Sequence, residues 1–274
     1  MSAAAMVAQI HPTALVDAAA QIADGVTIGP YAVIGPEVRI GSGTRIGPHA
    51  VLDGRVTLGC DNHVFAGACI GLEPQDLKYT GDNTEVVIGD RNRIREYVTI
   101  NRATAGSERT VLGDDNLLMA YSHLGHNCEL GNRIVIANGV AVAGHVHIAD
   151  RAVIGGVLGI HQFVHIGTMA MVGGMSRIDR DVPPFTMVEG HPGRLRGLNR
   201  LGLKRSGLAD QQGGAVQREL QQLWKLLYRS GLPLSEALLQ AKQQAVTDAG
   251  LELVRFLEAS CGADRRGPLP AQRP

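Results

Sequence analysis

The sequence is poor in aromatic residues and cysteine, and it has no long apolar run. Phe, Trp and Tyr make up 4% of the 274 residues, so the core cannot be built around large rings. The cysteines, Cys60, Cys69, Cys128 and Cys261, show no CxxC spacing, which argues against a disulfide framework or a zinc motif and favours reduced thiols. No stretch approaches the roughly 20 apolar residues that a membrane helix needs, so stable membrane insertion is not expected.

Net charge and an export signal are also missing. Lys plus Arg and Asp plus Glu number 26 each, which argues against a dedicated nucleic-acid-binding protein. The N-terminal segment MSAAAMVAQIHPTALVD contains neither a basic stretch nor a long apolar one, so we expect no signal peptide. These absences predict a soluble protein of the cytoplasm.

What the sequence has instead is a repeat of six residues. In the frame that starts at Ile10 and ends at Ile178, 26 of the 29 positions are Ile, Leu or Val, and only Asp76, Asp82 and Gly106 break it. Three such units form a triangular coil of 18 residues whose aliphatic side chains point inward. The pattern predicts an all-β solenoid, a parallel β-helix with the left-handed turn typical of hexapeptide-repeat proteins. Glycine often follows the aliphatic position, and we expect it to supply corner conformations that a Cβ would penalise.

Interruptions of the frame divide the chain further. The polar insertions 71–87 and 101–111 interrupt the frame without shifting its phase, and insertions in solenoids often build binding faces. Helical spacing follows in residues 209–230, and again in 233–258 with a break near Gly250. The sequence therefore predicts three parts: a β-helix domain over 1–190, a C-terminal helical domain over 191–262 and a disordered tail over 263–274.

Several histidines share one register of the predicted coil. His126, His145 and His161 are each separated by about one 18-residue coil, so they should climb one side of the solenoid, and His123 lies across a corner from His126. Solvated corner side chains, a zinc site and general-base catalysis are all compatible with this spacing. Cys128 raises a fourth possibility, a Cys–His nucleophile, although a buried unreactive thiol is the commoner case.

Several segments together resemble the UDP-N-acetylglucosamine O-acyltransferase family of lipid A biosynthesis. The resemblance covers nearly the whole chain, from IHPTA at 10–14 into the C-terminal helices. It is carried by QDLKYTG (75–81), IGDRNRIREYVTIN (88–101), DNLLMAYSHLGHNC (115–128), AGHVHI (143–148), GIHQFVHIG (159–167), MVGGMSRIDRDVPPF (171–185) and GLKRSG (202–207).

The resemblance implies a homotrimer with active sites between subunits. Members transfer an (R)-3-hydroxyacyl chain from acyl carrier protein to the 3-hydroxyl of UDP-N-acetylglucosamine, the first step of lipid A biosynthesis. The acyl chain is bound to the phosphopantetheine of the carrier, and no metal, other cofactor or covalent intermediate is required. By this resemblance His126 is the general base, and the backbone N–H of Gly144 meets the oxyanion.

Further site residues follow from the same resemblance. Gly174 falls where the family measures acyl length, and its small size predicts a chain longer than ten carbons. Two departures are Asn127, where many members have Asp, and Arg200-Leu201, where an acidic residue is often found. The residues implied to bind the substrates are Gln75, Asp76, Lys78, His123, His145, His161, Gln162, Asn199 and Arg205.

Rival functions remain open at the level of sequence. A related hexapeptide acyltransferase could use a different donor, such as acetyl-CoA, or a 3-amino sugar nucleotide as acceptor. The N-acyltransferase that acts later in lipid A biosynthesis usually carries an additional N-terminal uridine-binding domain, for which a repeat beginning at Ile10 leaves no room. The histidines could also serve a trimeric zinc hydratase of the carbonic anhydrase type, or the protein could be a non-catalytic scaffold.

Overall fold

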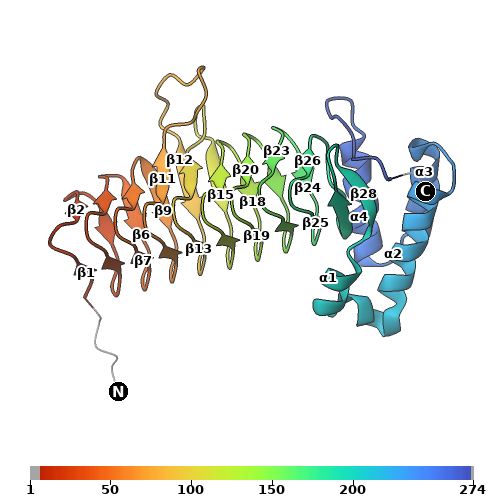
Figure 1. Ribbon diagram of the computed structural model, residues 1–274, viewed down its shortest axis with the longest axis horizontal. Helices are drawn as coiled ribbons and strands as arrows, with labels where there is room; N and C mark the ends of the chain where they lie inside the picture. Colours follow the sequence, from red (N-terminus) through yellow and green to blue (C-terminus); the bar gives the residue numbers. More distant parts are fainter. Residues whose placement is uncertain (1–6, 273–274) are drawn as a thin grey trace.

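The chain winds into a left-handed parallel β-helix that is covered by helices at its C-terminal end (Figure 1). The computed structural model describes residues 7–272. Residues 1–6 of the predicted first domain and 273–274 of the predicted tail lie outside this range. The predicted all-β solenoid with a C-terminal helical region is confirmed.

Three flat faces form the sides of the solenoid. Within the described residues, face A contains 11 strands: β1 (Gln9–Ile10), β4 (Thr27–Ile28), β7 (Arg45–Ile46), β10 (His63–Val64), β13 (Arg93–Ile94), β16 (Leu117–Leu118), β19 (Val135–Ile136), β22 (Val153–Ile154), β25 (Met171–Val172), β27 (Thr186–Glu189) and β28 (Arg194–Leu198). Face B is formed by β2 (Leu15–Val16), β5 (Val33–Ile34), β8 (Val51–Leu52), β11 (Cys69–Leu72), β14 (Thr99–Asn101), β17 (His123–Leu124), β20 (Ala141–Val142), β23 (Gly159–Ile160) and β26 (Arg177–Ile178). Face C is formed by β3 (Gln21–Ile22), β6 (Val38–Ile40), β9 (Arg55–Leu58), β12 (Glu85–Ile88), β15 (Arg109–Leu112), β18 (Glu129–Leu130), β21 (His147–Ile148) and β24 (His165–Ile166).

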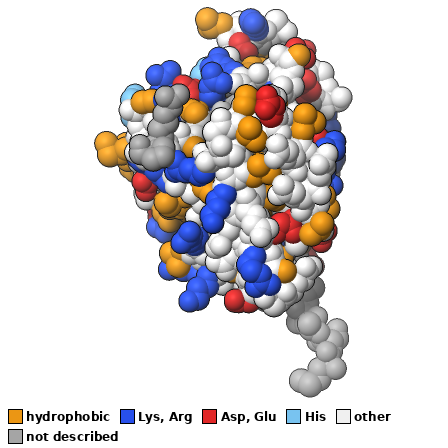
Figure 2. All heavy atoms as spheres, turned by 90° about the vertical axis from the view of Figure 1, so that its right-hand side faces the viewer, with side chains coloured by type: hydrophobic (Ala, Val, Ile, Leu, Met, Phe, Trp, Pro, Cys, Tyr) orange, Lys and Arg blue, Asp and Glu red, His pale blue; other side chains and the backbone are white. Residues whose placement is uncertain are grey.

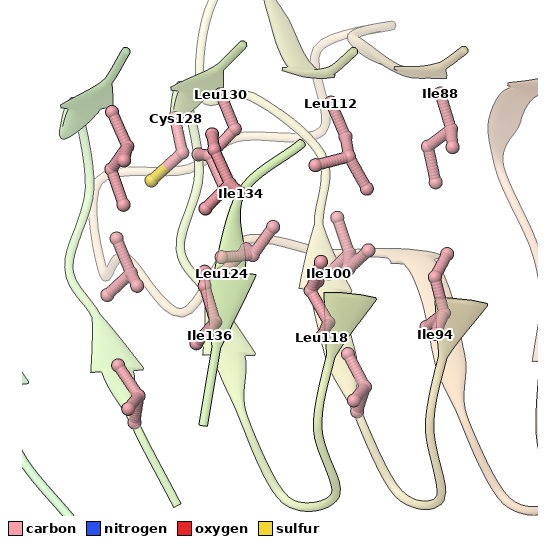
Figure 3. Close-up of a cluster of buried hydrophobic side chains, with 14 of the residues drawn as sticks. Ile88, Ile94, Ile100, Leu112, Leu118, Leu124, Cys128, Leu130, Ile134 and Ile136 are labelled. Atoms are coloured by element: carbon pink, nitrogen blue, oxygen red, sulfur yellow. The ribbon is translucent and has the colours of Figure 1, made fainter. Parts of the chain in front are cut away.

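The aliphatic residue of each hexapeptide points into the core and stacks on its equivalent in the next coil. Figure 3 shows such columns of Ile and Leu side chains inside the triangular section. Ile94, Leu118 and Ile136, consecutive members of one column, are each 0% exposed. Burying one such side chain contributes about 1.5–3 kcal/mol. Ile10, in the first coil, is 46% exposed, because no coil covers it from below.

The glycines that follow the aliphatic residues serve a purpose other than the one expected. At Gly41 an added Cβ would lie 2.5 Å from the carbonyl carbon of Gly59 in the next coil, so it is the close approach of stacked backbones that excludes a side chain. Of the thirteen Gly residues at this position up to Gly173, only Gly71 has a positive φ. Left-handed corner conformations fall elsewhere and are adopted mostly by other residue types, including Tyr31 and Asn127.

The two polar insertions leave the register of the coils intact. Asn92 N–H donates to Asn62 Oδ1 at 2.9 Å across a separation of 30 residues, and Asn116 N–H donates to Asn92 Oδ1 at 2.9 Å across 24 residues. Because both separations exceed the 18-residue coil of the regular parts by a multiple of six, the aliphatic frame resumes in phase. The extra residues project from the solenoid as loops next to β11 and β12 (Figure 1).

The helical region begins later than expected and has its break at a different place. Strand β28 pairs antiparallel with β27, so face A extends beyond the predicted boundary at residue 190. The second predicted helix is two helices that are separated at residues 245–247, and Gly250 lies inside the latter, where its N–H donates to Thr247. The helices are α1 (Arg200–Arg205), α2 (Gln211–Arg229), α3 (Leu234–Gln244) and α4 (Asp248–Ser260), with a 3₁₀ turn at Leu208–Asp210. None of the described helices is long and apolar enough to cross a membrane.

The prediction of disorder for residues 263–274 is wrong for its described part, 263–272. Leu269 is 1% exposed and joins the core of the solenoid. Its N–H donates to the Asp181 carbonyl at 2.8 Å, and the N–H of Gln272 donates to the Leu195 carbonyl at 3.0 Å. The polar composition concealed this arrangement because one leucine is enough to anchor the segment over the end of the coil.

Candidate active site

A groove of about 430 Å³ crosses face B near the corner that leads to face C. Strands β17, β20 and β23 supply its floor, the corners after β17 and β20 supply its edge, and the first insertion reaches it from the side. Its lining includes five of the residues predicted for the site. They are Gln75, His123, His126, Gly144 and Gln162.

His126 is held in place by the side chain of the next residue in the sequence. Its Nδ1 lies 2.9 Å from Asn127 Oδ1, and Asn127 is buried. Asn127 adopts φ 60°, a left-handed corner conformation that Asn tolerates better than most residues with a Cβ. Its backbone N–H donates to Thr110 Oγ1 at 2.9 Å. The imidazole therefore projects from a corner that is fixed on both sides.

Gly144 lies directly against the His126 ring. A Cβ at Gly144 would stand 2.5 Å from His126 Nε2 and 2.4 Å from Cε1, so only glycine leaves room for the imidazole in this position. The backbone N–H of Gly144 makes no hydrogen bond within the described residues. A free N–H beside a histidine is the arrangement that an oxyanion requires.

Two further histidines contact this pair. His145 meets the His126 ring edge-on at 5.1 Å and stacks on Phe163 at 4.7 Å. Burial is the main cause that lowers the pKa of His123 and of His145, and the nearby His126 lowers both further. His123 Nδ1 also lies 2.7 Å from Thr99 Oγ1. Both rings are therefore neutral at pH 7 and can exchange hydrogen bonds with an uncharged sugar.

Three other predicted residues lie near the groove but do not line it. The Asp76 carboxylate accepts a hydrogen bond from the Lys78 backbone N–H at 2.9 Å, which makes a turn at the tip of the first insertion. His161 Nδ1 lies 3.0 Å from the carbonyl of Gln162 and lines a smaller pocket of about 120 Å³ beside Arg265.

The chain by itself does not bring Asn199, Arg205 or Gly174 to the groove. The Asn199 side chain accepts from Gly202 N–H at 3.0 Å, which caps α1, and its Nδ2 donates to the Met169 carbonyl at 2.9 Å. Arg205 is the last residue of α1. Gly174 is exposed at the corner between β25 and β26, on the opposite edge of face B from His126.

A Cys–His nucleophile is disfavoured by the surroundings of Cys128. The thiol is 0% exposed and donates to the Ala143 carbonyl at 3.1 Å. Burial raises its pKa to about 12, so it is not a thiolate at neutral pH. In the part of the chain that the structure describes, no group of three or more His, Cys, Asp or Glu side chains is arranged to hold a metal ion.

Comparison with known proteins decides the family. Residues 181–269 match the family model described as "Udp N-acetylglucosamine O-acyltransferase; Domain 2", and residues 8–54 and 109–144 match that of the bacterial transferase hexapeptide. The acyl-[acyl-carrier-protein]–UDP-N-acetylglucosamine O-acyltransferase of Verminephrobacter eiseniae is 49% identical over 259 residues, 92% of this chain and 97% of that protein. This chain belongs to the UDP-N-acetylglucosamine O-acyltransferase family.

Solved structures of the family agree with the fold over the full length. LpxA from Acinetobacter baumannii is 40% identical and superposes with a TM-score of 0.88, covering 95% of this chain and 99% of that one. UDP-N-acetylglucosamine acyltransferase from Campylobacter jejuni is 34% identical with the same TM-score, covering 97% of this chain and 100% of that one. The resemblance inferred from the sequence motifs is confirmed.

The groove of this family member also contains a residue that the sequence reasoning missed. Asn101 lines the groove and is 5% exposed, and its Nδ2 donates to the Glu73 carbonyl at 2.7 Å. Its Oδ1 is buried and has no hydrogen-bond partner among the described residues. Asn101 directly follows the aliphatic Ile100, a position where glycine is frequent, and this break in the pattern could have identified it.

Proposed function

We propose that this protein transfers an (R)-3-hydroxyacyl chain from acyl carrier protein to the 3-hydroxyl of UDP-N-acetylglucosamine, the first step of lipid A biosynthesis. The observation that carries this proposal is the His126 ring packed against Gly144, whose N–H makes no hydrogen bond within the described residues, in a groove of the acyltransferase family. The reaction needs no metal and no cofactor apart from the phosphopantetheine that carries the donor.

The chemistry follows from these two groups. His126 Nε2 takes the proton of the attacking sugar hydroxyl, whose oxygen bonds to the thioester carbon. The carbonyl oxygen becomes an oxyanion, which accepts a hydrogen bond from Gly144 N–H. When the intermediate collapses, the C–S bond breaks and the imidazolium returns its proton to the departing sulfur. General-base assistance of this kind contributes about 10²–10⁴-fold.

Neutral polar groups in and beside the groove suit the sugar. We assign sugar contacts to Gln75, His123 and Gln162 in the lining. The other substrate-binding assignments rest on the family motifs and are carried by residues at the rim or farther away. These are Asp76, Lys78, His145, His161, Asn199 and Arg205.

A homotrimer accounts for the residues that one chain leaves apart. A neighbouring subunit packed along face B could bring Asn199, Arg205 and Gly174 to the groove. An edge for such packing is present: large apolar side chains are exposed in one column at the corner between faces A and B. They are Tyr31 (57% exposed), Tyr97 (54%), Tyr121 (66%), Val157 (68%) and Met175 (75%).

The acidic carrier protein has a candidate docking surface at the C-terminal end. Lys and Arg side chains are numerous there, with acidic ones between them (Figure 2). Lys204 and Arg205, in the last turn of α1, and Arg194 form no ion pair within the described residues, whereas Arg196 pairs with Glu189 at 3.6 Å. We expect KM for the acyl carrier protein to rise several-fold between 50 and 300 mM salt, and less for UDP-N-acetylglucosamine. A KM independent of salt would contradict this docking surface.

The direct test is an acyl-transfer assay with a panel of (R)-3-hydroxyacyl carrier proteins that differ in chain length. The acylated sugar nucleotide is followed by mass spectrometry, with UDP-N-acetylglucosamine and its 3-amino analogue as alternative acceptors. Formation of the ester supports the proposal, and a preference for donors longer than ten carbons supports the role of Gly174. Transfer to the amino sugar alone would favour that acceptor instead. No transfer by folded protein, together with tightly bound zinc, would favour a hydratase.

Gly144→Ala tests the oxyanion position without removing any functional group. The new Cβ would fall 2.5 Å from His126 Nε2, so the ring must move away from the acceptor hydroxyl. We expect kcat to fall by about 10²-fold, the scale set by a misplaced catalytic group. Gly156→Ala is the matched control, because the atom nearest to its Cβ would be the Asn138 carbonyl oxygen, at 3.1 Å, and Gly156 does not line the groove. Equal activity of the two variants would refute the arrangement.

We also place the enzyme in the cytoplasm. Cys60, Cys69, Cys128 and Cys261 are all unpaired, as expected for a reducing compartment.

A further inference from the structure

We infer that Glu108, on the second insertion, is a positioning residue that acts on His126 through the amide of Asn127. Asn127 Oδ1 lies 2.9 Å from His126 Nδ1, and Asn127 Nδ2 donates to Glu108 Oε2 at 2.7 Å. The Asn127 amide thus lies between the Glu108 carboxylate and the His126 imidazole and contacts both. This inference rests on the proposed role of His126 as the base.

The hydrogen bonds fix which way the Asn127 amide points. Its Oδ1 accepts from the Thr104 backbone N–H at 3.2 Å and from Thr104 Oγ1 at 3.1 Å. A flipped amide would put its NH₂ group against the Thr104 N–H, and two donors would then face each other. The Glu108 carboxylate can only accept, so it also requires Nδ2 on its side.

The orientation of the amide in turn sets the tautomer of His126. Because Asn127 presents an oxygen to Nδ1, that ring nitrogen carries the hydrogen and donates it. Nε2 is left with a free lone pair, and it is the atom that lies beside Gly144. A base needs this lone pair directed at the hydroxyl whose proton it removes.

Glu108 also supports the positive charge that develops on the ring during proton transfer. When His126 takes up a proton, the positive charge polarises the Asn127 amide, and the carboxylate at its far end stabilises that polarisation. The titratable groups facing His126 on neighbouring elements are His123 on β17 and His145 on the next coil, and both are neutral at pH 7. Glu108 therefore supplies the negative charge that Asp would supply in family members with Asp at position 127.

The test compares Glu108→Gln with the wild type in the acyl-transfer assay. We expect kcat to fall about tenfold with KM for UDP-N-acetylglucosamine within twofold, since one charge-assisted contact is weakened. Glu129→Gln is the matched control: Glu129 also contacts a histidine, His147 at 3.3 Å, but neither lines the groove.

Asn127→Asp distinguishes an electrostatic effect of Glu108 on His126 from a purely structural role of the second insertion. In the wild-type background it sets two carboxylates at the 2.7 Å contact and should lower kcat. In the Glu108→Gln background it places a carboxylate directly on His126 and should restore kcat to within about threefold of the wild type. Wild-type kcat in Glu108→Gln, or no rescue by Asn127→Asp, would overturn the inference. An inactive wild type would instead refute the proposed function.

Discussion

His126→Ala is expected to lower kcat by about 10³-fold and to leave KM for UDP-N-acetylglucosamine within a few-fold. The imidazole is the only group beside the free Gly144 N–H that can take a proton from the sugar hydroxyl, among the residues that line the groove. The other histidine in the lining, His123, has its Nδ1 engaged with Thr99 Oγ1 at 2.7 Å. The atoms nearest to a Cβ at Gly144 all belong to the His126 ring and none to His123.

Steady-state kinetics of purified His126→Ala, with its thermal unfolding alongside, checks this prediction. His147→Ala is the matched control, because that ring lies on face C against His165, at 4.4 Å, and does not line the groove. We expect the control to keep nearly full kcat. If His126→Ala retained more than about a tenth of wild-type kcat, proton removal by this residue would be ruled out as a main contribution.

Asp181→Asn is expected to lower the free energy of unfolding of the C-terminal region by about 3–5 kcal/mol. Asp181 is 3% exposed, and its carboxylate accepts from Arg265 at 2.6 and 3.0 Å and from Ser260 Oγ at 2.7 Å. It also accepts from the His165 backbone N–H at 2.8 Å. One carboxylate thus joins the last coil, the end of α4 and the tail, and its neutralisation leaves Arg265 without a counter-charge.

His165 depends on the same network. Burial, and then the charge of Arg265, lowers its pKa to about 4, so the ring is neutral at pH 7. Its Nε2, at 3.0 Å from Arg265, can then accept a hydrogen bond. A neutral ring offers Arg265 no negative charge, which is why the guanidinium has no substitute for Asp181.

Denaturant unfolding and hydrogen exchange of residues 263–272 measure the loss. Asp179→Asn is the matched control: it is two residues away, its side chain is 28% exposed, and it pairs with Arg177 at 3.3 Å, so we expect a change within about 0.5 kcal/mol. Adding Arg265→Met to Asp181→Asn should recover part of the stability, because the uncompensated charge disappears. Equal stability of Asp181→Asn and Asp179→Asn would contradict the prediction.

The repeating part of the fold could be predicted because each coil depends only on its neighbours. A side chain such as Leu118 points inward because of its position in the six-residue period, and this position can be read from the local sequence. The tail could not be predicted in this way. The burial of Leu269 depends on contact with Asp181 and Leu195, far back in the sequence, and local composition cannot report such contacts.

The residues of the candidate site can be divided in the same way, into those that sequence reasoning found and those that it missed. The whole-coil spacing predicted that His126, His145 and His161 lie on one side of the solenoid, and the family motifs added Gly144 and Gln162. Glu108 was missed because it reaches His126 through an insertion, whose path no period describes. Asn101 was missed although it occupies a position after an aliphatic residue where glycine is frequent. The position of Asn199 and Arg205 relative to the groove depends on a neighbouring subunit, which one chain does not specify.

The sequence by itself determined the solenoid, its core and the family, since these rest on a short period and on contiguous motifs. Only the tertiary structure decided why glycine often follows the aliphatic residues, where the helices break and how the tail is anchored. It also decided that the Glu108 carboxylate contacts Asn127 behind the His126 ring. The physical reason is common to all four: each depends on atoms from different coils or segments approaching within about 3 Å, the hydrogen-bonding range, and spacing along the chain does not encode such approaches.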